Sequence, residues 1–151
     1  MERRSLAASS AWSESGVNDF LSEYTAPLRL AVLDGSGFPR VCSLWFRYEE
    51  GRLFCATKGK SKVVDWIREN PKCGFEVATN EPPYYGVRGR GRATVASAGA
   101  VELLATLVDR YLGDRETEFS RRLLSRVEDE VAIEIEIDWM TSWDYRSRMS
   151  E

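Results

Sequence analysis

The chain has 151 residues, of which 43% are hydrophobic, and its formal net charge at pH 7 is −3. This length is typical of a single domain with a sizeable core. The sequence contains no histidine, which excludes Ser-His-Asp triads, imidazole general bases and histidine-ligated zinc or haem. The slightly negative charge argues against a nucleic-acid partner, and no apolar run approaches the ~18 residues of a membrane span.

The cysteines and the N-terminal segment bear on location and domain organisation. Cys42, Cys55 and Cys73 form an odd set without CxxC spacing. We therefore expect free thiols in a reducing, cytoplasmic compartment, and no bound metal. Residues 1–14 lack the apolar stretch of a signal peptide. We expect them to form a flexible arm ahead of one domain over residues 15–151.

Periodicity and turn signals predict the first elements. A short helix is expected over residues 15–24. Residues 28–57 carry three strand signals separated by DGSG and EEGR, and such short turn-rich separators are typical of antiparallel hairpins. The second of these strands, residues 41–48, has apolar side chains on both faces. We therefore expect it to be a central strand that is covered on both sides.

The second half of the chain continues this pattern. A helix is predicted from Ser61, a good N-cap, to the residue before Pro71. Strands are expected at 72–79, 86–96 and 130–143, and helices at 98–113 and 116–127. In the last strand, alternation predicts one face made of Val131, Ile133, Ile135, Ile137 and Trp139. Six short strands with mostly hairpin connections predict a mainly β (α+β) fold, an antiparallel barrel with peripheral helices.

The strand over residues 86–96 is rich in arginine and glycine. Arg88, Arg90 and Arg92 share one face and could grip phosphates or carboxylates. Alternatively, they could form a cross-strand charge ladder with the acidic face of the last strand. That face consists of Glu134, Glu136 and Asp138. Gly89 and Gly91 indicate either a close approach of a flat group to the backbone or a bend in the barrel.

The stretch TKGKSK, residues 57–62, lies just before the predicted helix. Helix N-termini attract anions through free N–H groups and the helix dipole. The charges of three lysines and the positive end of the helix dipole should repel each other unless a bound anion neutralises them. The sequence leaves two interpretations open, a phosphate cradle and a solvated turn. The acidic residues 128–130 are expected to be solvated, and no side chain is assigned a catalytic role.

The ordered stretches DGSGFPRV, LFCATKGKSKVVDWIRENP and VRGRGRATV resemble those of FMN-binding split β-barrel proteins related to pyridoxamine 5′-phosphate oxidase. The resemblance covers residues 28 to about 95. It implies a six-stranded antiparallel split β-barrel that forms a homodimer with FMN at each of two subunit interfaces. It also implies flavin-dependent oxidoreductase activity on a small molecule, for which NADH or NADPH is a candidate electron donor.

The resemblance also implies which residues hold the cofactor. Ser61 and Lys62 occupy the phosphate-holding positions, with Lys58 and Lys60 as helpers. The strand over residues 41–46 would run beside the isoalloxazine ring, and residues 55–57 would line the ribityl chain. The expected cofactor-binding set is Val41, Ser43, Leu44, Trp45, Cys55, Ala56, Thr57, Lys58, Lys60, Ser61 and Lys62. The candidates for a substrate or a cofactor tail are Arg88, Arg90 and Trp143.

Two departures from the family pattern affect the expected substrate. The family favours arginine where this chain has Ser61, although a hydroxyl can still donate. The oxidase proper uses a C-terminal arginine–histidine motif, which a chain without histidine cannot supply. We therefore do not expect oxidation of pyridoxamine phosphate. Related short members use a deazaflavin coenzyme with an acidic tail, so a deazaflavin-dependent reductase is the alternative, together with a non-catalytic flavin-binding module.

Overall fold

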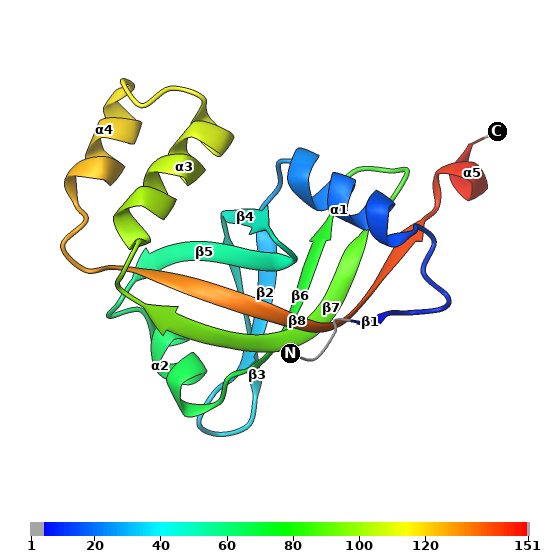
Figure 1. Cartoon of the computed structure of the whole chain (residues 1–151), viewed down its shortest axis with the longest axis horizontal. Coiled ribbons are helices and arrows are strands. Elements are labelled where there is room, and N and C mark those ends of the chain that lie inside the picture. Colours follow the sequence, from blue (N-terminus) through cyan, green and yellow to red (C-terminus); the bar gives the residue numbers. More distant parts are fainter. Residues whose placement is uncertain (1–4, 151) are drawn as a thin grey trace.

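The computed structural model describes residues 5–150 (Figure 1). The strands form one sheet in the order β3-β2-β6-β7-β8-β5-β4, with β1 beside β8. They are β1 (Ser5–Leu6), β2 (Leu28–Leu33), β3 (Pro39–Leu44), β4 (Phe46–Glu49), β5 (Arg52–Lys58), β6 (Lys72–Ala78), β7 (Tyr85–Ala96) and β8 (Glu130–Asp144). The helices are α1 (Glu14–Glu23), α2 (Lys62–Glu69), α3 (Ala100–Leu112), α4 (Glu118–Ser125) and α5 (Arg146–Met149).

The sheet curls into a half-barrel because of how β3 and β4 are joined. Only Trp45 separates these two strands in the chain, yet they lie at opposite ends of the strand order. The two edges of the sheet must therefore approach each other (Figure 1). The expected antiparallel split β-barrel with peripheral helices is confirmed. The described part has eight strands rather than six, because the second expected strand is broken at Trp45 and β1 is added.

The expectation that residues 41–48 form a central, covered strand is wrong. In the described chain β3 pairs with β2 and β4 pairs with β5, and Val41 is 69% exposed. The break is held by Tyr111 of α3, whose ring stacks on that of Trp45 with 5.0 Å between centroids. The Tyr111 hydroxyl also accepts the Phe46 N–H at 3.1 Å. Apolar residues on both faces of this strand therefore mark an edge whose outer face is open within one chain.

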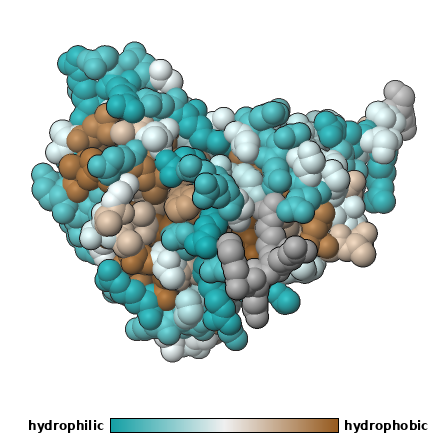
Figure 2. Space-filling model, in the orientation of Figure 1, coloured by the Kyte–Doolittle hydropathy of each residue, from teal (hydrophilic) through white to brown (hydrophobic). Residues whose placement is uncertain are grey.

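The hydrophobic core fills the inside of the curled sheet and extends under the helices. Its largest fully buried side chains include Leu21, Phe46, Leu53, Ile133 and Ile135. The helix predictions are confirmed, including the end of α3 at Gly113, which has a φ of 72° and so adopts the left-handed conformation that glycine favours. Figure 2 shows hydrophobic residues at the surface around α3 and α4, where Val101 and Phe119 are exposed.

A bulge in β8 changes which side chains face the core. Arg90 pairs with Trp139 but Gly91 pairs with Ile137, so Asp138 is an extra, unpaired residue. Such a residue shifts the alternation of all later side chains by one position. Met140 is accordingly buried, and the expectation that Trp139 shares the face of Ile137 is wrong. A Cβ at Gly91 would overlap the Glu136 carbonyl oxygen, so this glycine permits the bend of the barrel.

The start of the chain lies along β8. β1 pairs in parallel with Trp139 and Met140, and the Trp12 N–H donates to Ser142 Oγ at 2.9 Å. Both contacts involve part of the segment that we expected to be an arm, whereas residues 1–4 of that segment lie outside the described residues. In residues 5–150, no helix has the length and apolar character needed to cross a bilayer.

Candidate functional site

A groove of about 520 Å³ lies on the outer face of the sheet. One row of outward-facing residues crosses five strands in register. It consists of Val41, Ala31, Gly74, Arg90 and Trp139. Because Ala31 and Gly74 have almost no side chain, the row is hollowed between Val41 and Arg90. The groove therefore has a small-residue floor and larger walls, a shape that suits a flat ring.

The rim of this groove carries three arginines and one carboxylate, Glu76, which lies opposite Arg29 and Arg88 in the strand register. Arg88 lies 5.0 Å from the ring centroid of Trp143, and Arg90 lies 5.9 Å from that of Trp139. Arg29, on β2, donates through Nη1 to Ser43 Oγ at 2.6 Å. The aromatic rings hold the guanidiniums of Arg88 and Arg90, and all three arginines line the groove beside its apolar floor.

The structure argues against the charge ladder that the sequence allowed. Among the described residues, no carboxylate lies within ion-pair distance of Arg88, Arg90 or Arg92. Glu134 instead pairs with Arg52 of β5 at 2.5 Å. The bulge also carries Arg88 and Arg90 past the acidic stretch, so that they face Thr141 and Trp139. Arg92 does lie opposite Glu136, and Arg88 lies opposite Glu76 of β6, so within this row only Arg90 has no carboxylate directly opposite it.

The turn before α2 is held by two acidic residues of the chain itself. Lys58 Nζ lies 2.7 Å from Glu130 Oε1, and the Glu130 side chain is only 5% exposed. Lys60 N–H donates to Asp129 Oδ2 at 3.0 Å, and a Cβ at Gly59 would stand 2.6 Å from Asp129 Oδ1. The expectation that residues 128–130 are solvated is thus wrong for Glu130. It is buried because the start of β8 pairs with the end of β5, placing it opposite Lys58.

The N-terminus of α2 keeps unused donors beyond this turn. Ser61 is the N-cap, but its side chain makes no capping hydrogen bond and lies 3.2 Å from Thr57 Oγ1. The N–H groups of Lys62 and Val63 have no acceptor among the described residues, and the Lys62 ammonium has no carboxylate partner there. Two backbone donors, a hydroxyl and an ammonium at a helix N-terminus are the elements of a phosphate site.

Arg40 is a further cation near α2 that the sequence prediction missed. Its guanidinium lies 4.6 Å from the ring centroid of Trp66, one helical turn after Lys62, and its Nη1 is 3.3 Å from Asp34 Oδ2. The only sequence signal for Arg40 is its place after a hairpin turn. The packing of that hairpin on α2 is a tertiary contact that the local sequence does not reveal.

The predicted site residues separate into distinct groups. Val41, Arg88 and Arg90 line the groove. Ser43 and Trp143 do not line it, but they contact its arginines Arg29 and Arg88. A second group gathers at the N-terminus of α2 and consists of Thr57, Lys58, Lys60, Ser61 and Lys62. The remaining predicted residues, Leu44, Trp45, Cys55 and Ala56, are half-buried or buried, and Cys55 belongs to the core. The sequence analysis did not predict that Arg29 and Trp139 line the groove. For Trp139 the reason is the bulge, which reverses the face that this side chain takes.

The three thiols are poorly suited to nucleophilic chemistry. Burial raises the pKa of Cys55 and of Cys42, and it raises the pKa of Cys73 to about 12. All three are free cysteines. Because the thiolate is the reactive form, these side chains stay protonated at neutral pH and act as core residues.

Known structures share this fold. A conserved hypothetical protein from Mycobacterium tuberculosis aligns with a TM-score of 0.79 and 21% identity, over 100% of this chain and 94% of that one. An F420 reductase aligns with a TM-score of 0.66 and 24% identity, over 82% and 94% of the two chains. A FAD-binding protein from Mesorhizobium loti aligns with a TM-score of 0.65 and 18% identity, over 87% and 94%.

These similarities establish the fold. The structures that share it also include a protein of Listeria innocua assigned as a pyridoxamine 5′-phosphate oxidase. The resemblance to split-barrel proteins that was drawn from the sequence is therefore confirmed at the level of the fold. No protein-family model and no curated protein matches the chain.

Proposed function

We propose that this protein is a flavin-dependent oxidoreductase that binds FMN and acts on a small redox substrate other than pyridoxamine phosphate. The observation that carries the proposal is the open N-terminus of α2 within a split barrel. The Ser61 hydroxyl and the Lys62 ammonium would contact the FMN phosphate, together with the N–H groups of Lys62 and Val63, which have no acceptor among the described residues. The positive end of the helix dipole adds to this attraction.

The turn residues contribute by neutralising part of the local charge. Glu130 and Asp129 hold Lys58 and the Lys60 backbone, so the turn keeps its shape before a ligand arrives. A pre-organised site of this kind loses less conformational entropy when a ligand binds, which favours binding. FMN, when bound, would supply the hydride chemistry, whereas the protein would orient the ring and exclude water.

A homodimer is part of the same proposal. The outer face of β3 exposes Val41, which also lines the groove. A second copy that covers this face would bury the apolar floor and complete a pocket for the flavin ring. Val41→Asp should then shift the protein toward monomer in sedimentation velocity and lower FMN occupancy. A dimer that persists unchanged in this variant would contradict the assignment of this face. A cytoplasmic location, expected from three free thiols, belongs to the proposal as well.

A deazaflavin coenzyme is the second candidate, and the arginine row favours it. Arg88 and Arg90 form no ion pair in the described chain and line the groove with Arg29, around a single carboxylate, Glu76. A coenzyme with an acidic tail would satisfy all three guanidiniums. Under this alternative, Arg88→Gln with Arg90→Gln should weaken deazaflavin binding more than FMN binding. Equal loss for both cofactors would favour FMN.

The first experiment is the absorbance spectrum and the mass of the small molecule that copurifies with the protein. Ser61→Ala with Lys62→Ala should then weaken FMN affinity at least tenfold, since each charged hydrogen bond contributes ~1.5–3 kcal/mol. Arg68→Ala, at the other end of the same helix, is the control and should leave affinity unchanged. Unchanged affinity in the double variant would mean that the FMN phosphate does not bind at Ser61 and Lys62. Reduction by NADH or NADPH in stopped flow separates an enzyme from a non-catalytic module.

A further inference from the structure

A second hollow, the Trp12 pocket, lies between α1 and the C-terminal segment, at the end of the molecule away from α2 (Figure 1). It has a volume of about 240 Å³ and is lined by Trp12, Gly16, Phe20, Tyr85 and Arg146. The ring centroids of Trp12 and Phe20 are 5.0 Å apart, and they lie 6.0 and 5.9 Å from that of Tyr85. Three segments distant in the sequence thus build one pocket with aromatic walls.

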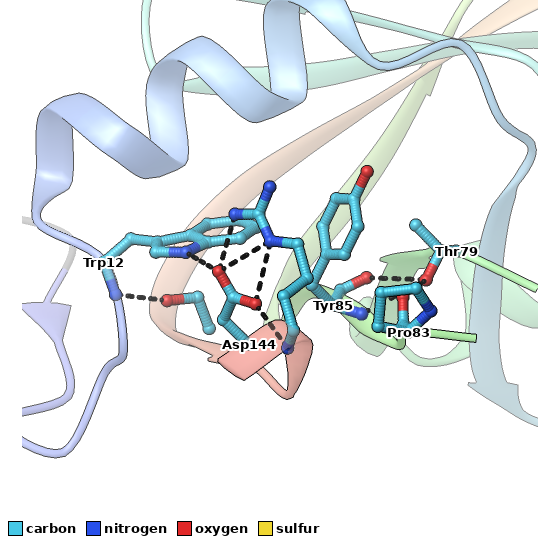
Figure 3. Close-up of polar contacts among 7 residues, drawn as sticks. Trp12, Thr79, Pro83, Tyr85 and Asp144 are labelled. Atoms are coloured by element: carbon cyan, nitrogen blue, oxygen red, sulfur yellow. Dashed lines mark hydrogen bonds and ion pairs between the residues drawn. The ribbon is translucent and has the colours of Figure 1, made fainter. Parts of the chain in front are cut away.

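Arg146 is held in a fixed orientation at this pocket. Its Nη2 donates to Asp144 Oδ2 at 2.6 Å, and its Nε donates to Asp144 Oδ1 at 3.0 Å. The Trp12 indole N–H donates to the same carboxylate at 3.0 Å, and Figure 3 shows Asp144 between Trp12 and Tyr85. The guanidinium lies 4.3 Å from the Tyr85 ring centroid. Its Nη1 has no acceptor among the described residues, so one cationic edge remains unused.

We propose that the Trp12 pocket binds a monocyclic aromatic carboxylate. Because the indole N–H is already used, Trp12 and Phe20 offer only aromatic surface, and rings pack well on such walls. The unused Nη1 donors of Arg146 match a carboxylate. A cavity of about 150 Å³ holds benzene, so this pocket has room for a ring with a carboxylate group.

Other ligand classes fit less well. An ammonium group would meet the Arg146 guanidinium, and the nearest carboxylate, Asp144, already accepts from both Arg146 and Trp12. A neutral ring would leave the Nη1 donors without an acceptor. A separate hollow of about 370 Å³ lies on the other side of Tyr85, where Figure 3 shows Thr79 and Pro83, but it is lined by Glu81. Glu81 has no cationic partner among the described residues, whereas Asp144 is neutralised by Arg146, so an acid fits the Trp12 side better.

The inference does not depend on flavin binding and is tested with benzoate as the probe. Isothermal titration of the full chain should show saturable benzoate binding at least fivefold tighter than benzyl alcohol or benzylamine. Arg146→Gln should weaken benzoate at least tenfold and leave benzyl alcohol unchanged. The matched control is Arg148→Gln in the same helix, where Arg148 stacks on Tyr145 instead; it should alter neither affinity.

A second variant keeps the test independent of the arginine. Trp12→Leu retains the charge of Arg146 but removes an aromatic wall, so it should weaken both benzoate and benzyl alcohol. Circular dichroism confirms that each variant is folded before titration. Benzoate binding that does not saturate, that is equal in the native and Arg146→Gln proteins, or that is weaker than benzylamine binding would overturn the proposal. Equal binding of the Trp12→Leu variant would do the same.

Discussion

Gly91→Ala should be strongly destabilising, because β8 passes directly over this position. The added Cβ would overlap the Glu136 carbonyl oxygen and stand 3.0 Å from its carbonyl carbon. Both atoms belong to the backbone, so no side-chain rotation relieves the overlap, and β7 must separate from β8. Overpacking of this kind costs about 1–3 kcal/mol or more. Alanine would otherwise stabilise a strand by about 0.5–1 kcal/mol relative to glycine, and the clash must exceed this gain.

The measurement is urea and thermal unfolding of the Gly91→Ala protein. A net loss of about 2 kcal/mol corresponds to a fall in Tm of about 4–8 °C for a chain of this size. Gly74→Ala is the matched control on the neighbouring strand. Its Cβ would stand 3.6 Å from the Gly89 carbonyl oxygen and 3.8 Å from Ala31 Cβ, so stability should stay within about 0.5 kcal/mol. A Gly91→Ala protein as stable as the native one would refute the inference that β8 passes too close to this position for a side chain.

Three further predictions concern titratable and buried groups. Arg146 lowers the pKa of Asp144, so the stability that this carboxylate contributes is present above pH ~4 and lost as pH falls below it; Asp144→Asn should flatten that acid limb in pH-dependent thermal melts. Glu130→Gln should cost about 1–2 kcal/mol in urea unfolding, since it removes the charged acceptor of a hydrogen bond from Lys58, whose side chain is partly exposed; no change would mean that the pair is without net effect. Ellman's reagent at pH 8 should leave Cys55 and Cys73 unreacted until urea is added, and fast labelling of either in the native protein would contradict their burial.

Local sequence signals were sufficient for most elements. The cap and stop signals around α2 and the left-handed Gly113 after α3 depend only on nearby residues, and such signals are readable in one sequence. The hairpin turns were readable for the same reason. The bulge at Asp138 could not be predicted, because an extra residue in one strand can be recognised only from its pairing with the neighbouring strand. Trp139 was therefore assigned to the wrong face and missed as a groove residue.

The candidate site also combines features that local sequence predicts with features that depend on tertiary contacts. The lysines and Ser61 before α2 were found because a helix start and its charges are adjacent in the chain. Only the tertiary structure shows that one of these charges is compensated, because Lys58 pairs with Glu130, which lies some 70 residues away in the chain. The open edge at Val41 was also misjudged, since apolar residues on both faces look the same in a central strand and in an uncovered edge.

By itself, the sequence determined the class of fold, the absence of histidine chemistry and the cluster of donors at one helix start. These properties follow from composition and from short-range spacing, which do not require knowledge of the partner strand. The tertiary structure alone decided which arginines form no ion pair within residues 5–150, where the groove lies, and that Trp12, Tyr85 and Arg146 share one pocket. Those features arise where distant segments meet, and their register depends on a single extra residue in β8.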